Sequence, residues 1–105
     1  MKAKRRPRPT DYAAEDALRI TGDHLGAWRR LQGLTQAQVA ERAGVSRGAV
    51  VRAEAGEPGT TMDTFLRVLG ALHVTESLTT ALDPYRSDVG IARADELLPQ
   101  RVRRA

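Results

Sequence analysis

The sequence predicts a compact all-α domain of five short helices, with a basic arm before it and a short tail after it. Beyond the first ten residues, proline occurs only at positions 58, 84 and 99, so long stretches are free to form helix. Apolar residues recur at helical spacing, and no segment alternates apolar and polar residues as a half-buried strand does. A chain of 105 residues, 41% of them hydrophobic, can build one modest core.

The arm, residues 1–10, carries five basic residues and no acidic one, and it contains Pro7 and Pro9. Like charges, prolines and a lack of apolar residues predict disorder. The arm is either a solubilising tail or a segment that follows phosphates or enters the minor groove, with Arg5 and Arg6 as candidate contacts. Residues 11–22 form an acidic lead-in that could be a short helix.

Residues 23–82 are expected to hold the five helices. Asp23 is the expected N-cap of the first helix, which runs from His24 to about Gln32 and ends at Gly33. Its inner side is predicted to carry Leu25, Trp28 and Leu31. Trp28 is expected in the core rather than as a stacking platform.

The next two helices are each preceded by a capping residue and followed by glycine. Thr35 caps a helix from Gln36 to about Ala43, and Gly44 breaks it. Ser46 caps a helix from 47 to about 55, which Gly56 ends. The predicted inward side chains of the two helices are Val39, Ala40, Ala43, Ala49, Val50 and Ala53, with Val45 buried between them.

The fourth helix is expected to start at Thr60 or Thr61, where Asp63 completes a capping box or favours the helix dipole. Its half-buried stripe is predicted to consist of Met62, Phe65, Leu66, Leu69 and Leu72. Thr75 is expected to cap a fifth helix over residues 76–82, which Asp83 and Pro84 terminate. In the tail, residues 83–105, one or two helical turns are expected from Ala92 to Leu98.

Composition excludes several classes of function. The chain has no cysteine, so it has no disulfide, Cys-ligated zinc, iron–sulfur cluster or catalytic thiol. His24 and His73 are too far apart in sequence to form a metal-ligand spacing, and no catalytic or phosphate-loop arrangement is present. We therefore expect no enzyme activity, no cofactor and no metal. One Trp, one Phe and two Tyr provide no aromatic stacking surface for RNA.

The distribution of charge indicates a polyanionic partner. The formal net charge is +4, but residues 1–10 and 25–56 are both positive, and residues 11–24 between them are acidic. Separate positive zones are suited to a polyanion bound on one face. No apolar segment approaches the ~20 residues of a membrane span, and no secretory signal follows the basic start. A cytoplasmic protein without membrane contact is expected.

Residues 34–56, LTQAQVAERAGVSRGAVVRAEAG, predict a helix-turn-helix. Gly44 supplies the positive φ that a sharp turn requires, and Ala40 is small enough for the two helices to approach closely. The second of these helices then exposes one face near its N-terminus, where side chains can reach base edges in the major groove. These features point to double-stranded DNA as the ligand and so to a nucleoid-associated location.

From about Leu25 to Val74 the chain resembles the XRE family, also called Cro/C1 or phage-repressor-like. The resemblance is carried by Leu34-Thr35-Gln36, Val39-Ala40, Gly44-Val45-Ser46, Val50 and Arg52-Ala53-Glu54-Ala55-Gly56. It implies a repressor-like DNA-binding domain and a role in transcription regulation. The pattern departs from most members in having Val39 where they have Leu and Val50 where they have Ile.

The resemblance also implies roles for individual residues. Gln36 matches a position that contacts phosphate and supports base recognition, and Arg47, Gly48 and Arg52 match base-facing positions of the recognition helix. Arg29 and Glu54 match a buried ion pair, which is architectural.

Further candidate contacts follow from the chemistry of the side chains. Val51 can touch a thymine methyl group, and the Ser46 hydroxyl can cap its helix or read a base. Thr60 and Thr61 can offer a hydroxyl and amides to a phosphate at the start of the fourth helix, and simple capping is the alternative role. Thr35, the expected cap of the helix from Gln36, is a further candidate DNA contact.

One such domain reads only ~4–6 base pairs, which favours a homodimer on an inverted repeat. The fourth and fifth helices and the tail are the expected dimer surface, through Leu78, Leu82 and Tyr85. The alternative is that Leu78 and Leu82 close the monomer core. The tail around residues 97–103 is similar to tails of small regulators encoded beside toxin kinases of the HipA type. That resemblance implies an antitoxin that binds its toxin and represses the shared promoter.

Overall fold

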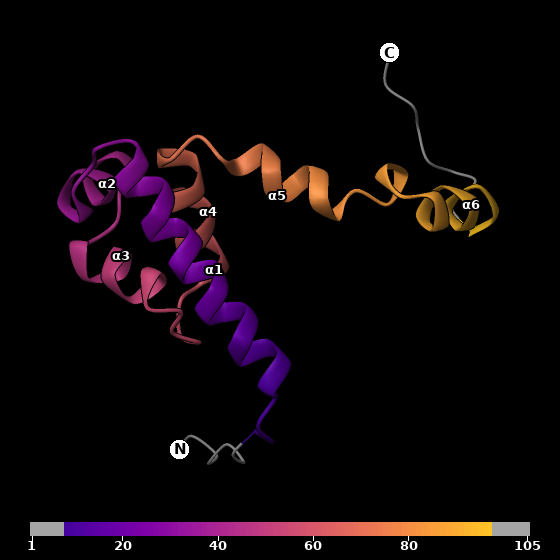
Figure 1. The fold of residues 1–105 in the computed structure, drawn as a ribbon, viewed down its shortest axis with the longest axis horizontal. Coiled ribbons are helices and arrows are strands. Elements are labelled where there is room, and N and C mark those ends of the chain that lie inside the picture. The colour runs from indigo at the N-terminus through magenta and orange to yellow at the C-terminus, as the bar shows by residue number, and fades with distance from the viewer. Residues whose placement is uncertain (1–7, 98–105) are drawn as a thin grey trace, which may run out of the picture. The chain divides into compact units, whose positions relative to one another are not determined.

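The computed structural model describes residues 8–97, and every regular element in that range is helical (Figure 1). The elements are α1 (Tyr12–Leu31), α2 (Gln36–Ala43), α3 (Arg47–Glu54), α4 (Met62–Ala71), α5 (Thr75–Leu82), the 3-10 helix η1 (Pro84–Arg86) and α6 (Asp88–Leu97). The all-α fold class is confirmed. This part of the chain holds six α-helices, one more than predicted, because the tail contributes α6.

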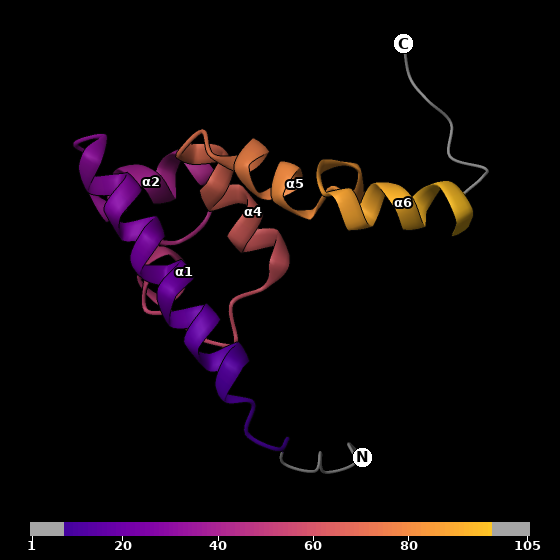
Figure 2. The same ribbon diagram turned by 45° about the vertical axis from the view of Figure 1, so that its right-hand side comes forward.

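The chain divides into two compact units, Met1–Leu72 and His73–Ala105. The first contains α1 to α4. In Figures 1 and 2 its helices α2, α3 and α4 gather along the C-terminal part of α1, whose N-terminal end extends beyond them. The second unit contains α5, η1 and α6, and η1 packs against both of its α-helices.

Helix α1 begins at Tyr12 rather than at His24, so the predicted cap at Asp23 is wrong. The true N-cap is Asp11, whose Oδ1 accepts a hydrogen bond from the Ala14 amide at 3.0 Å. Asp23 is an exposed residue inside the helix. The lead-in, residues 11–22, therefore belongs to the same continuous helix as residues 23–31, because its alanines and leucine favour helix and nothing interrupts it.

Two glycines allow α1 to lie very close to the end of α3. A Cβ atom at Gly22 would stand 2.5 Å from the backbone oxygen of Glu54 and 2.8 Å from the amide nitrogen of Gly56. Gly56 itself has a φ of +71°, and a Cβ there would stand 2.6 Å from the Leu18 carbonyl oxygen. The two backbones touch directly, which fixes the position of α3 on α1.

The helix-turn-helix forms as predicted. Thr35 Oγ1 accepts from the Gln38 amide at 3.0 Å, and the Gln38 side chain accepts from the Thr35 amide, which completes a capping box. Gly44 ends α2 with a φ of +70°. Ser46 Oγ then caps α3 by accepting from the Ala49 amide at 3.0 Å.

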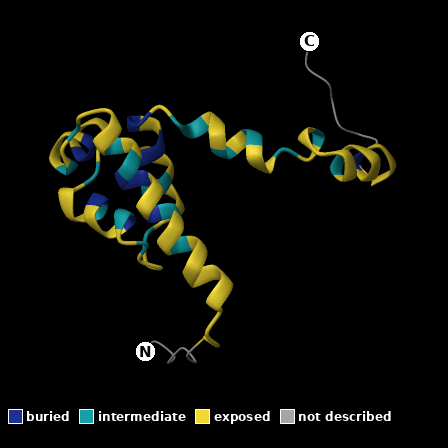
Figure 3. Ribbon diagram, viewed as in Figure 1, coloured by how far each residue is buried: buried dark blue, intermediate teal, exposed yellow. Residues whose placement is uncertain are grey.

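The core lies where α1 to α4 meet, as the dark-blue segments of Figure 3 show. All of the predicted inward residues of α2 and α3 are buried except Ala49, which is half-buried, as is Val45. In α4, Leu69 is buried, as is Leu72 just after it. The stripe assigned to α4 is partly wrong, since Met62 and Leu66 are exposed and Val68 is buried instead.

The predicted core position of Trp28 is also wrong. Its side chain is 45% exposed, and Leu31 is 77% exposed, whereas Leu25 is buried. A step of three residues advances about 300° around a helix, so Leu25, Trp28 and Leu31 drift progressively away from one face. The buried face of α1 instead includes Gly22 and Gly26, which bring the helix close to its neighbours.

In the second unit, two predicted boundaries need correction. Thr75 is the first residue of α5 rather than its cap, because Val74 is at the N-cap and makes no side-chain cap hydrogen bond. Helix α6 begins at Asp88, before the predicted Ala92, since the Ser87 hydroxyl accepts from the Gly90 amide at its start. Asp83 ends α5 as predicted.

Some predictions lie outside the described residues. These include the disorder of the first seven residues and the end of the tail from position 98 onward. None of the helices between residues 8 and 97 combines the length and apolar composition needed to cross a bilayer.

Candidate nucleic-acid interface

Helix α3 presents one polar face to solvent and one apolar face to the core. Arg47, Gly48 and Arg52 are exposed, and Val51 is 41% exposed beside them. Val50 and Ala53, on the opposite side, are buried. The structure therefore brings the predicted base-facing residues together on one accessible surface, with two guanidinium groups and no acidic side chain of α3 among them.

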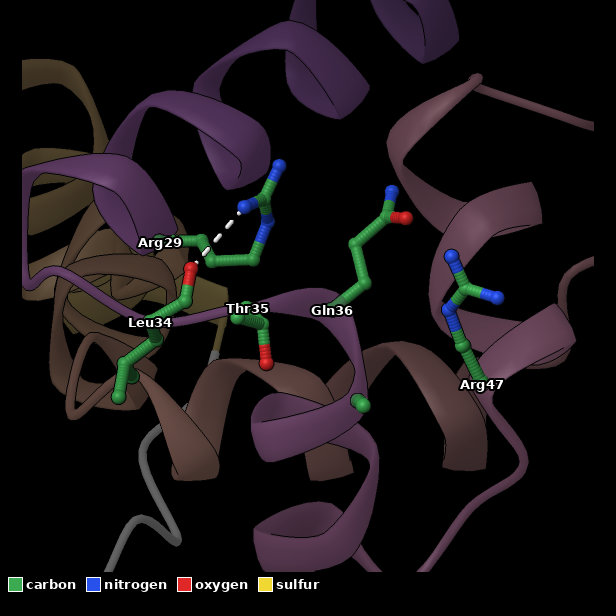
Figure 4. A pocket seen from close by; sticks show the side chains of 6 residues that line it. Arg29, Leu34, Thr35, Gln36 and Arg47 are labelled. Carbon is green, nitrogen blue, oxygen red and sulfur yellow. Dashed lines mark hydrogen bonds between the residues drawn. The ribbon is translucent and has the colours of Figure 1, made fainter.

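A shallow hollow of about 630 Å³ lies beside this surface, at the N-terminal turn of α2 (Figure 4). Its lining includes Arg29, Thr35, Gln36 and Arg47. In the view of Figure 4, the Gln36 side chain stands between those of Arg29 and Arg47. A helix N-terminus carries the positive end of the helix dipole, so an anion at the hollow would meet a favourable field from the helix and from Arg47.

Arg29, which lines the hollow, forms an ion pair that links α1 to α3. Arg29 Nε donates to Glu54 Oε2 at 2.7 Å, and Arg29 Nη2 donates to Glu54 Oε1 at 3.1 Å. The remaining Nη1 of Arg29 donates to the Leu34 carbonyl oxygen at 3.0 Å, as the dashed line in Figure 4 marks. The hydrogen bond with Glu54 raises the pKa of Arg29, against the opposing effect of burial.

This geometry gives the ion pair an architectural use. The Arg29 guanidinium binds both the carboxylate at the C-terminal end of α3 and the carbonyl group just before α2. It therefore fixes the end of α3 and the start of α2 in position relative to α1. The two side chains are only 15% and 11% exposed, which places the pair largely out of water.

The Glu54 carboxylate accepts a third hydrogen bond, from a second partner that the sequence did not predict. Gln36 Nε2 donates to Glu54 Oε1 at 3.2 Å. The side chain assigned to phosphate contact is thus held by the ion pair, and Gln36 is half-buried. The two positions are 18 residues apart in sequence, so no local signal predicts this bond.

The remaining candidate contacts include four side chains with a hydroxyl group, and three of these hydroxyls cap helices. Thr35 and Ser46 each cap a helix, and so does Thr61, whose Oγ1 accepts from the Thr64 amide at 3.1 Å. The Thr60 Oγ1 is buried and makes no hydrogen bond, so it does not face solvent. Arg5 and Arg6 lie outside the described residues.

Two supporting side chains were missed. Gln38 closes the capping box of α2, and the Thr-x-x-Gln spacing could have identified it. Arg67 of α4 donates to the Ala43 carbonyl oxygen at 3.5 Å and to Asp63 Oδ2 at 3.0 Å, so it covers the C-terminal end of α2. Asp63 therefore pairs with Arg67 in addition to lying in the first turn of α4.

Comparison with known proteins identifies the same region. A protein-family model described as helix-turn-helix matches residues 25–78, which span the hollow, both helices of the motif and α4. No curated protein and no solved structure gave a match.

Proposed function

The chain belongs to the XRE-type helix-turn-helix family of DNA-binding transcription regulators, and we propose that it acts as a repressor that reads an inverted repeat as a homodimer. The observation that carries the proposal is the exposed face of α3, where Arg47, Gly48, Val51 and Arg52 lie together. In this proposal α3 enters the major groove.

The two arginines supply the base contacts. Each guanidinium can present a bidentate pair of donors to guanine O6 and N7, which favours a half-site containing guanine. Gly48 between them brings the helix backbone close to the bases, and Val51 provides an apolar contact for a thymine methyl group. Such contacts discriminate between sequences, which phosphate contacts alone cannot do.

The hollow at the start of α2 holds a backbone phosphate. The dipole of α2, Gln36 and Arg47 attract it, and Glu54 keeps Gln36 in place. Arg29 is occupied by Glu54 and Leu34, so its role in this proposal is to hold the site together. Thr61, as an exposed cap at the start of α4, offers a second contact of this kind.

The test is a comparison of two double variants. Arg47→Ala/Arg52→Ala should reduce affinity for the operator by at least about 30-fold, because each bidentate pair is worth ~1–3 kcal/mol. Its free energy of unfolding should stay within ~1 kcal/mol, since both side chains are exposed. Arg86→Ala/Arg93→Ala removes the same charge from exposed positions in the second unit and is the matched control. If both double variants lost the same affinity for the operator, the loss would be due to net charge. The assignment of base contacts to Arg47 and Arg52 would then be wrong.

A second candidate function is that of an antitoxin, which binds a toxin kinase of the HipA type and represses the operon of the pair. The second unit favours it, because α5 buries none of its residues and Leu82, Val89 and Leu97 are exposed. Stable co-purification with a kinase encoded beside the gene would support this function, and purification of the chain without that kinase would oppose it. Loss of the kinase after deletion of residues 83–105 would assign the contact to the tail.

A further inference from the structure

Helix α1 carries a second, mostly apolar face that is distinct from its buried one, with His24 as its polar member. Six residues recur at steps of four and three positions along the helix: Ala13, Ala17, Ile20, His24, Ala27 and Leu31. This is the heptad spacing of a helix–helix seam. We call these six residues the outer face of α1.

The outer face is accessible in the structure. Ile20 is 44% exposed and Leu31 is 77% exposed. Ala27 is half-buried, and the other three residues are exposed. Trp28 flanks the face and is also among the exposed large apolar residues. Figure 3 shows the long exposed stretch of α1 toward its N-terminal end.

The outer face is separate from the surface that packs in the first unit. Gly22, Leu25 and Gly26 are the buried residues of α1, and on average they lie roughly 170° around the helix from the outer face, at about 100° per residue. Gly22 is where α3 touches α1. The outer face can therefore receive a partner without displacing α3.

The charges toward the two ends of the outer face are self-complementary, whereas Asp23 near its centre would lie beside Asp23 of an antiparallel copy. Asp16 and Asp23 flank one edge in the N-terminal half of α1, and Arg30 flanks the same edge near its C-terminal end. When a second α1 lies antiparallel, Asp16 of each copy comes near Arg30 of the other. The Asp16 carboxylate also contacts Arg19 at 3.5 Å, but that pair is largely exposed and therefore weak.

The antiparallel register also matches side-chain sizes. When Ala13 faces Leu31 of the second copy, Ala17 faces Ala27 and Ile20 faces His24, so the small residues of one end receive the large residue of the other. A parallel register would instead bring the acidic N-terminal halves together and place Leu31 against Leu31. Charge and size therefore both favour the antiparallel arrangement.

We propose that two copies of this chain associate through the outer face of α1, with the two helices antiparallel. The seam is about 27 Å long, at ~1.5 Å per residue from Ala13 to Leu31. Helix α1 is already folded in each copy, and its C-terminal part is packed in the first unit, so pairing does not require that part to order first. The use of this dimer for reading an inverted repeat rests on the proposed function, but its formation does not.

The absence of cysteine from the chain makes a crosslinking test clean. Ala17→Cys/Ala27→Cys places two thiols about 15 Å apart on one helix, too far to bridge within a copy. Under mild oxidation this double variant should give a disulfide-linked dimer, and neither single variant should. A linked dimer from Ala17→Cys alone would mean that the helices are parallel and would overturn the proposal.

A matched pair of leucines locates the surface. Leu31 and Leu82 are 77% and 73% exposed, so replacing either by serine should leave the fold intact. In sedimentation equilibrium without DNA, Leu31→Ser should raise the dimer dissociation constant at least about tenfold, because it acts twice across the two-fold axis. Leu82→Ser should leave it unchanged. The reverse result would place the dimer surface in the second unit.

Charge variants test the register. Arg30→Asp should weaken the dimer about tenfold, and Asp16→Arg added to it should restore association. Asp23 lies near the two-fold axis, beside Asp23 of the second copy, so Asp23→Asn should tighten the dimer.

A chain that is monomeric at hundreds of micromolar overturns the proposal. A dimer that selects no DNA sequence would instead contradict the proposed function and leave this surface in place.

Discussion

Replacing Glu54 by alanine is the sharpest test of how the interface is held together. The substitution removes the bidentate partner of Arg29, with its 2.7 and 3.1 Å hydrogen bonds, and the acceptor of Gln36 at 3.2 Å. Arg29 keeps only the Leu34 carbonyl oxygen. Its side chain is 15% exposed, so a guanidinium charge would remain largely desolvated and without a counter-ion.

The expected cost follows from that geometry. Breaking a buried ion pair by removing one partner costs ~3–5 kcal/mol, out of a total stability of ~5–15 kcal/mol for a domain. For a domain of this size the melting temperature should fall by about 12 °C or more. Thermal unfolding followed by circular dichroism measures this fall.

The hydrogen bond with Glu54 raises the pKa of Arg29 in the folded chain. The charged form of Arg29 therefore stabilises the fold at every pH below its unfolded pKa. This stabilisation is lost only as the pH rises through the raised pKa, far above neutrality.

The control is another ion pair of the same kind on the surface. Asp63 and Arg67 are 78% and 52% exposed, so Asp63→Ala should change stability by no more than ~0.5 kcal/mol. Replacing both partners of the buried pair, as Arg29→Met/Glu54→Leu, should recover much of the loss. If Glu54→Ala costs less than ~1 kcal/mol, the pair does not hold the site together.

Three further results are expected. Gly22→Ala should destabilise by ~1–3 kcal/mol in denaturant unfolding, because its Cβ would collide with fixed backbone atoms. Gly48→Ala should be neutral or stabilising, because its Cβ would approach closely only the flexible Arg52 side chain, with Ser46 Oγ at an ordinary contact distance of 3.9 Å. A stable Gly22→Ala would contradict the close approach of α1 and α3. Gln36→Ala should cost ~1 kcal/mol of stability or less, yet weaken duplex binding in fluorescence anisotropy; unchanged binding would remove Gln36 from the interface. Deleting residues 2–9, with their five basic side chains, should flatten the salt dependence of binding by up to ~0.9 for each phosphate that the arm neutralises, and an unchanged slope would exclude the arm.

Local sequence signals were sufficient for the helix-turn-helix. Thr35, Gly44 and Ser46 act through hydrogen bonds and backbone angles within their own turn, so their roles can be predicted from neighbouring residues alone. Arg29 and Glu54 are 25 positions apart in sequence, and their ion pair was implied only by family resemblance.

Long-range packing explains what could not be predicted. Asp11 and Asp23 are equally good caps by residue type, and a helix that starts after Asp11 has to continue through Gly22. Gly22 stays in the helix because the backbone of α3 packs directly against it, at a distance that leaves no room for a Cβ atom. Helix α1 also has two apolar faces, and periodicity alone did not show that the one with Leu25 is buried and the one beside Trp28 is not.

Selection from random duplex DNA tests the central claim most directly. The purified chain is incubated with the pool at about 150 mM salt, which suppresses plain charge attraction, and bound duplexes are sequenced over successive rounds. We predict an enriched inverted repeat whose half-sites contain guanine, and loss of that enrichment in Arg47→Ala/Arg52→Ala. A pool that shows no enriched sequence, or the same enrichment with both arginines replaced, would contradict recognition of DNA by the exposed face of α3.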